Sequence, residues 1–330
     1  MKLRLLALSL ALLLCIPLLS ACGEGENTYI LYNKLNTDIS ITLYSGGTQK
    51  KQADLIADCE ALLDEAERVL SRTDLAAELA TVNASDEPIL MVSPILADVL
   101  SRSLTLAAET GGCFDPTAGA LSALYDITGD APLPPDPAAL AAARETVGYE
   151  GITLNAMLLS RPVGTVLDFG AIAKGYLAER LVSYLLEAGV SGGVLSLGGN
   201  IATFGEKKGG RDFRIALRAP EGGYAGVLCL TGETYVSTSG AYERNRVGTD
   251  GKIYHHIFDP ATGAPAESDL ASVTVVDEDG ARADALSTAL YVMGYEQALA
   301  YHAAHGDFEM LLILANGEIY QTQGLRFEQA

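Results

Sequence analysis

The amino-acid sequence predicts an α+β fold in which mixed sheets are flanked by helices. Segments with the period-2 alternation of β-strands occur in clusters, amphipathic helical segments separate the clusters, and no repeat divides the chain. The chain has 330 residues, of which 49% are hydrophobic and 19% charged, so it is long enough to bury a large core. This composition excludes a collagen, a coiled coil and a disordered protein.

The N-terminus of the chain predicts a targeting segment that takes no part in the fold. Two basic residues precede an almost wholly apolar run over residues 5–19, which is shorter than the roughly 20 residues that a membrane span needs. Small residues then precede Cys22, which is the bacterial lipobox pattern. We expect a signal peptide at residues 1–21, lipidation of Cys22 after cleavage, and a short tether at residues 22–27. Lipid anchoring would place the protein outside the cytoplasmic membrane.

Local patterns predict one strand and two helices in the first third of the chain. Apolar residues alternate over Asp38–Tyr44, which predicts a strand, and recur at helical spacing over Gln52–Ser71, which predicts an amphipathic helix. Ser93 followed by Pro94 is typical of a helix start, and we expect that helix to end at Gly111–Gly112.

Prolines and aspartates over Gly129–Pro137 predict a loop, which we place between two lobes. Asp136 starts a short helix that ends near Gly148, and further helices are expected at Ala171–Gly189 and Ala283–Met293. The strands expected after the loop are Gly151–Leu154, Thr165–Leu167, Gly193–Leu197, several short strands within Phe213–Val236, Ser272–Val276, Glu309–Leu314, and Glu318–Tyr320 after an Asn316–Gly317 turn.

The net charge of −20 argues against nucleic acid or an anionic membrane surface as a partner, because a long-range field of that sign repels them. A phosphate-bearing ligand must therefore be held by a metal or by local backbone and basic groups. Cys59, Cys113 and Cys229 remain once the leader and Cys22 are set aside, and they lack Cys-x-x-Cys spacing. They indicate neither a disulfide framework nor a zinc site.

Three segments contain residues that suit a binding or catalytic site. In the first, Val166–Tyr176, a strand delivers Asp168 to a turn at Gly170, after which a helix begins. Backbone amides, carbonyls and one acid then meet at a helix N-terminus, which suits a polar ligand. The alternative is that Asp168 only caps the helix.

The second segment, Tyr254–Gly263, holds two of the four histidines, His255 and His256, side by side. Neighbours in an extended segment face opposite sides, so we do not expect them to share one metal ion. One of them could point into a cleft as a proton acceptor. The alternative is a surface pair beside an Asp-Pro turn, and His302 and His305 are interpreted as surface residues.

The third segment, Ala283–Leu290, holds Asp284 and Thr288 at positions i and i+4, so a carboxylate and a hydroxyl share one helix face. Two hard oxygens suit Mg²⁺, which fills the rest of its shell with water and phosphate oxygen. The alternative is that Asp284 is a helix N-cap and Thr288 bonds back to the backbone. Leu197–Asn200 and Ser237–Gly240 are weaker candidates, because the first lacks the Rossmann and P-loop spacings and the second is a common kind of polar turn.

Taken in order, these segments closely resemble the ApbE family of FAD:protein FMN transferases. The resemblance covers residues 28 to the C-terminus and departs from the family at Leu35–Thr37 and at Arg72–Thr73, where an aromatic is common. It implies a domain of residues 28–330 with two lobes around a central cleft for FAD and Mg²⁺. The segments that carry the resemblance are Ser71–Asn83, Phe114–Asp115, Asp168–Tyr176, Leu197–Ile201, Ser237–Gly240, His256–Gly263 and Ala283–Ala289.

The resemblance also implies a reaction in which Mg²⁺ binds the FAD pyrophosphate. A Ser or Thr hydroxyl of a target protein attacks the FMN-side phosphorus, and AMP leaves. The implied metal ligands are Asp284, Thr288 and the backbone carbonyl of Ala171, and the implied base is His256. The implied FAD contacts are Thr73, Cys113, Phe114, Asp115, Asp168, Lys174 and Ile257.

The family's usual acceptors are extracytoplasmic subunits of redox complexes, or flavin reductase domains with an FMN-attachment Ser/Thr motif. Two other functions fit the same residues. One is a Mg²⁺-dependent FAD pyrophosphatase that releases FMN and AMP to water. The other is a non-catalytic flavin-binding lipoprotein, against which Asp284, Thr288 and His256 argue because binding alone needs no base.

Overall fold

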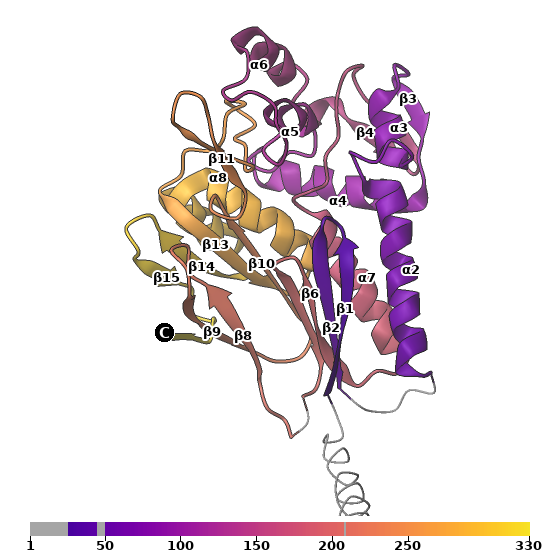
Figure 1. The fold of residues 1–330 in the computed structure, drawn as a ribbon, viewed down its shortest axis with the longest axis vertical. Helices are drawn as coiled ribbons and strands as arrows, with labels where there is room; N and C mark the ends of the chain where they lie inside the picture. The colour runs from indigo at the N-terminus through magenta and orange to yellow at the C-terminus, as the bar shows by residue number, and fades with distance from the viewer. Residues whose placement is uncertain (1–25, 45–49, 208) are drawn as a thin grey trace, which may run out of the picture.

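Figure 1 shows the computed structural model of the chain, which describes residues 26–44, 50–207 and 209–330. The expected signal peptide, the lipidated Cys22 and most of the tether lie outside these residues. The last part of the tether prediction is wrong, because strand β1 (Glu26–Lys34) already begins at Glu26. Glu26 and Asn27 pair with the end of β2 (Thr37–Tyr44), so the sheet continues to the first described residue.

An eight-stranded sheet forms the centre of the molecule, with the order β1-β2-β6-β7-β10-β13-β14-β15. Every neighbouring pair in it is antiparallel. This confirms the α+β prediction, since a regular β-α-β winding would give parallel pairs. The strands not yet given are β6 (Gly192–Leu197), β7 (Asn200–Gly205), β10 (Thr234–Gly240), β13 (Leu270–Asp277), β14 (Glu309–Leu314) and β15 (Ile319–Gln321).

Helices cover one face of this sheet. Helix α7 (Ala173–Glu187) packs on β6 and β7, and α8 (Gly280–His305) packs on β10 and β13. Helix α2 (Gln52–Leu70) lies outside α7, and α4 (Pro94–Glu109) contacts both α2 and α8 (Figure 1). Apolar side chains of the sheet and these helices form the main core. Helix α8 continues past its expected end through a kink at Gly294, where φ is 75°.

The other face of the central sheet packs against a three-stranded sheet of order β16-β9-β8. Its strands are β8 (Phe213–Arg218), β9 (Tyr224–Leu230) and β16 (Phe327–Gln329). Phe213, Leu228 and Leu311 are among the buried residues between the two sheets. Because both faces of the central sheet are covered, β13 and β14 are almost wholly buried.

Short elements gather at one end of the central sheet (Figure 1). A small three-stranded sheet there has the order β3-β5-β4, and β11 and β12 form a hairpin. Arg246 of this hairpin donates hydrogen bonds to the Gly129 and Ala131 carbonyls, so the hairpin lies against the loop at Gly129–Pro137. The elements are α3 (Glu78–Ala84), β3 (Ile89–Met91), α5 (Gly119–Tyr125), α6 (Pro137–Arg144), a 3₁₀ turn (Tyr149–Gly151), β4 (Thr153–Asn155), β5 (Leu158–Ser160), β11 (Asn245–Val247) and β12 (Ile253–His255).

The strand expected at Thr165–Leu167 is wrong. Only Val166 forms an isolated bridge, with Ala118. The Asn83 side chain takes the place of a partner strand, since its Nδ2 donates to the Leu167 carbonyl and its Oδ1 accepts from the Leu167 amide, both at 2.8 Å. A side chain therefore satisfies the backbone that leads into Asp168.

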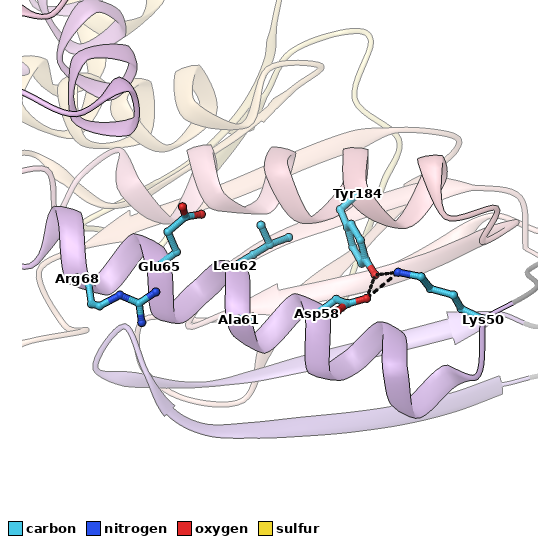
Figure 2. Close-up of a pocket in the computed structure, with 7 residues that line it drawn as sticks. All are labelled: Lys50, Asp58, Ala61, Leu62, Glu65, Arg68 and Tyr184. Atoms are coloured by element: carbon cyan, nitrogen blue, oxygen red, sulfur yellow. Dashed lines mark hydrogen bonds and ion pairs between the residues drawn. The ribbon is translucent and has the colours of Figure 1, made fainter.

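A surface groove follows the seam between α2 and α7 (Figure 2). At one end Asp58 accepts hydrogen bonds from Lys50 and from the Tyr184 hydroxyl, and Arg68 lies at the other end. The groove contains none of the residues that the sequence singled out. No helix within the described ranges is long and apolar enough to cross a bilayer.

Candidate active site

The N-terminal ends of α7 and α8 cross in backbone contact. A Cβ on Gly175 would lie 1.9 Å from the Gly280 carbonyl oxygen, and one on Gly280 would lie 2.6 Å from the Gly175 carbonyl oxygen. Only glycine allows two helices to approach this closely. Arg102 of α4 ties the crossing together, because its guanidinium binds Glu179 of α7 at 2.6 Å and Asp279, the N-cap of α8, at 2.5 Å.

Asp284 is buried at this crossing, with 3% of its surface exposed. Its Oδ2 accepts from the Gly175 amide at 3.0 Å and its Oδ1 from the Ser237 hydroxyl at 3.1 Å. Lys174 Nζ lies 4.0 Å from Oδ1. The alternative that Asp284 caps α8 is wrong, because Asp279 is the cap and accepts from the Arg282 amide. Burying a carboxylate costs free energy, so the position of Asp284 in the second turn of α8 needs an explanation other than capping.

The Ala171 carbonyl just before α7 lacks its usual helical donor. In an uninterrupted helix the Gly175 amide would donate to it, but that amide donates to Asp284 and α7 begins only at Ala173, two residues later than expected. Within the described part of the chain no hydrogen bond to the Ala171 carbonyl is made. Thr288, one turn after Asp284, is partly exposed, and its Oγ1 is 3.2 Å from the Ser239 hydroxyl.

These three oxygens fit a hard divalent cation. The described residues contain no group of three or more His, Cys, Asp and Glu side chains that could hold a metal, so a site here would have one carboxylate and neutral oxygens. Mg²⁺ binds in this way when water and substrate phosphate fill the rest of its shell. That Asp284, Thr288 and the Ala171 carbonyl bind Mg²⁺ stays a prediction.

Hydroxyls behind Asp284 form a network, which joins segments that the sequence analysis named only as weaker candidates. Ser237 Oγ lies 3.2 Å from both Asn200 Oδ1 and Ser287 Oγ, and Ser239 Oγ lies 2.8 Å from Ser287 Oγ. The segment Ser237–Gly240 is not a turn but the end of β10, where alternation turns Ser237 and Ser239 toward α8. The Ser-x-Ser spacing could have predicted this, because alternate residues of a strand face the same side.

We predict that Ser237→Ala destabilises the protein by about 1–3 kcal/mol, because it leaves the buried Oδ1 of Asp284 without its hydroxyl donor. Thr238→Ala is the matched control. Its hydroxyl lies on the opposite face of β10 and pairs with Thr274 at 2.9 Å, away from Asp284. Urea unfolding of both variants measures the difference. Equal losses of unfolding free energy would show that the network adds nothing specific at Asp284.

The two adjacent histidines have different surroundings. His255 is buried, its Nε2 faces the Ala266 carbonyl at 3.1 Å and its Nδ1 accepts from the Ile257 amide at 3.3 Å. Both of its ring nitrogens are thus used by the backbone. His256 is half-buried, and its Nδ1 faces the Arg244 carbonyl at 3.2 Å. Because a carbonyl only accepts, Nδ1 carries the proton and Nε2 of the neutral ring holds the lone pair.

The imidazole of His256 is neutral at physiological pH. Its pKa is lowered to about 4, mainly by burial and also by the nearby positive charges of Arg244 and Lys174, although the hydrogen bond to the Arg244 carbonyl opposes the change. The residue can therefore accept a hydrogen bond or a proton at Nε2.

Asp168 holds a turn and an ion pair. Its Oδ1 accepts from the Gly170 amide at 2.9 Å, and its Oδ2 lies 3.0 Å from Nε of Arg72. The alternative that it caps the helix is wrong, since Ile172 is the N-cap of α7 and no side chain caps it. Lys174 lies between the two acids, with Nζ 3.5 Å from the Gly170 carbonyl. Asp168 and Lys174, which we expect to contact FAD, thus border the Asp284 site.

The other residues that we expect to contact FAD differ in how exposed their side chains are. Thr73 is exposed beside Arg72. Phe114 and Ile257 are each 3% exposed within the main core, which leaves their backbone as the part that can contact a ligand. Asp115 accepts from the Thr117 and Tyr149 amides, and burial raises its pKa. Cys113 is partly exposed, and burial raises the pKa of its thiol.

Solved structures of ApbE proteins share this fold. The apo form of the flavinyl transferase ApbE from Pseudomonas stutzeri superimposes with a TM-score of 0.82 at 27% identity, covering 90% of this chain and 95% of that one. The ApbE protein from Thermotoga maritima also gives a TM-score of 0.82, at 28% identity, covering 91% of this chain and 97% of that one.

The chain belongs to the ApbE family, whose model matches residues 35–312. A curated relative named FAD:protein FMN transferase, from Treponema pallidum (strain Nichols), is 32% identical over 311 residues, which are 88% of this chain and 85% of the relative. A relative of the same name from Klebsiella pneumoniae (strain 342) is 30% identical over 288 residues, 84% of this chain and 81% of the relative. The family resemblance predicted from the sequence motifs is therefore confirmed.

Proposed function

We propose that this protein transfers FMN from FAD to a Ser or Thr hydroxyl of an acceptor protein and releases AMP. The observation that carries the proposal is the arrangement at the α7–α8 crossing. One buried carboxylate lies beside a basic side chain there, and the Ala171 carbonyl just before α7 accepts no hydrogen bond from the described residues. The neutral ring of His256 has no hydrogen-bond partner at Nε2 among the same residues. The name shared by the curated relatives supports the same reaction.

Asp284, Thr288 and the Ala171 carbonyl would hold Mg²⁺. When bound, the metal supplies positive charge that offsets the pyrophosphate and the charge that develops on the leaving AMP. The Gly175 amide and the Ser237 hydroxyl hold the Asp284 carboxylate in one orientation. The positive charge of the metal is needed because a protein with a net charge of −20 otherwise repels a dinucleotide.

His256 acts on the acceptor side of the reaction. The acceptor hydroxyl donates to Nε2 of the neutral imidazole while its oxygen attacks the FMN-side phosphorus. The new O–P bond forms, the bond from that phosphorus to the oxygen of AMP breaks, and the hydroxyl proton passes to Nε2. Since the pKa of His256 is about 4 in the protein, the proton moves only as the O–P bond forms and the hydroxyl becomes acidic.

The test combines full-length protein in detergent with FAD, MgCl₂ and a flavin reductase domain that carries a candidate attachment Ser or Thr. Intact mass spectrometry of the acceptor is expected to show the added mass of FMN. The matched control is the same acceptor with that hydroxyl residue replaced by Ala, which should gain nothing. An unmodified wild-type acceptor, with free FMN accumulating instead, would contradict the proposal in favour of FAD hydrolysis.

We also propose that the protein works outside the cytoplasmic membrane, held there by lipid on Cys22. The lipobox pattern supports this location. The prediction is that Cys22→Ala leaves an unprocessed precursor that no longer incorporates a labelled fatty acid. Gel mobility and fatty-acid labelling of both proteins measure it. Unchanged cleavage and unchanged membrane retention of the variant would show that another feature directs the protein.

A further inference from the structure

Arg72 lies at the edge of the site, although the sequence analysis noted it only as part of a departure from the family pattern. It follows Ser71, the C-cap of α2, and pairs through Nε with Oδ2 of Asp168 at 3.0 Å. Both side chains are 23% exposed, so the pair is neither buried nor fully solvated. The other oxygen of Asp168 is fixed by the Gly170 amide at 2.9 Å. The guanidinium is thus held by an acid whose own position is set.

The ion pair uses only one edge of the guanidinium. Arginine has five N–H donors in a planar fork, and the contact at Nε leaves the four donors of the two Nη atoms. Across the residues described here, neither Nη atom of Arg72 has a hydrogen-bond partner. The contact at Nε fixes the orientation of the guanidinium and leaves its two Nη atoms available. Two such N–H groups side by side fit two oxygens of a phosphate.

The charge distribution favours an anion as the occupant of this fork. The protein has a net charge of −20, so a dinucleotide must be held by a metal or by local backbone and basic groups. Lys174 is the other basic residue at this edge, and its Nζ is already directed to the Gly170 carbonyl and to Asp284. Arg72 is linked to the Asp284 site through Asp168, the Gly170 turn and Lys174, and it has unused donors there.

We infer that Arg72 binds the pyrophosphate of FAD through its two Nη atoms while Asp168 holds its Nε. This inference rests on the proposed function, because it assigns a further contact to the same dinucleotide. It also gives Asp168 a definite part, which is to orient Arg72 as well as to hold the turn that presents Ala171.

Equilibrium binding tests the inference without turnover. FAD, ADP and riboflavin are titrated into full-length protein in detergent with MgCl₂, using flavin fluorescence for FAD and riboflavin and calorimetry for ADP. Arg72→Gln is expected to weaken FAD and ADP by about tenfold or more, since a charge-assisted hydrogen bond to phosphate is lost, and to leave riboflavin unchanged. Arg72→Lys should remain weakened, because an ammonium has no planar fork.

Arg68→Gln is the matched control. Arg68 lies one turn earlier on α2, in the groove of Figure 2 and away from Asp168. Equal affinities of wild type and Arg72→Gln for ADP, no binding of ADP to the wild type, or an equal loss of riboflavin binding would each overturn the inference. Failure of the proposed function looks different, because the wild type would then bind FAD and ADP but leave the acceptor unmodified.

Discussion

Asp284→Ala is expected to lower the rate of flavin transfer by at least about a hundredfold, because a metal ion supplies several kcal/mol of transition-state stabilisation. Asp284 contributes the one ionised group among the proposed ligands. Without it, the Ala171 carbonyl and the Thr288 hydroxyl are neutral oxygens with little affinity for Mg²⁺. Transfer to the acceptor is measured by intact mass over a range of MgCl₂ concentrations.

The controls for Asp284 separate metal binding from folding. Asp284→Asn keeps the size of the side chain and an oxygen for the Gly175 amide, so it should fold like the wild type while its transfer collapses. Thr288→Ala should raise the MgCl₂ requirement less, since a hydroxyl contributes less than a carboxylate. Circular dichroism checks that each variant is folded. A folded Asp284→Ala protein with full activity would rule out this metal site.

His256→Ala is expected to slow transfer by about a hundredfold or more while FAD affinity stays nearly unchanged, because general base catalysis typically contributes 10²- to 10⁴-fold. The base acts on the acceptor hydroxyl, so its loss affects kcat rather than the binding of the dinucleotide. Single-turnover rates and FAD titrations of the same preparation measure the two effects separately. A parallel loss of FAD binding and rate would make His256 a ligand contact instead.

His255 and the pH dependence provide contrasts for His256. His255→Ala should lower the melting temperature, since both ring nitrogens of His255 bond to the backbone and its ring packs edge-on against Tyr291. Burial lowers the pKa of His256 to about 4, so its lone pair is lost only as the pH falls toward that value. We therefore expect no decline in the transfer rate from this residue between pH 8 and pH 6. A decline centred near pH 6.5 would contradict this.

Local patterns in the sequence predicted the long elements well. The amphipathic spacing of Gln52–Ser71, the Ser93 cap and the alternation of Asp38–Tyr44 are confirmed, because each signal depends on near neighbours in the chain. Short elements such as β3, β5 and α5 were missed, since three to seven residues carry too little periodicity. Thr165–Leu167 looks like a strand locally, but the side chain of Asn83, far away in sequence, replaces the partner strand.

The candidate site was predicted from motifs, and its supporting contacts were not. Spacing put Asp284 and Thr288 on one helix face, and the structure brings Lys174 and the Gly175 amide to Asp284. The Gly175–Gly280 contact, the hydrogen bond from Ser237 to Asp284 and the Arg72–Asp168 ion pair join residues that are 47 to 105 positions apart. No local pattern encodes such pairs, because they depend on how α7, α8 and β10 pack in three dimensions.

The measurement that tests the central claim most directly compares AMP release with acceptor modification in one reaction. Full-length protein, FAD, MgCl₂ and acceptor are incubated, AMP is quantified by chromatography, and flavinylated acceptor is quantified by intact mass. We predict equal amounts of the two products, and almost no AMP when the attachment Ser or Thr of the acceptor is replaced by Ala. AMP release that continues at the same rate with this replaced acceptor would contradict the account and identify the protein as an FAD pyrophosphatase.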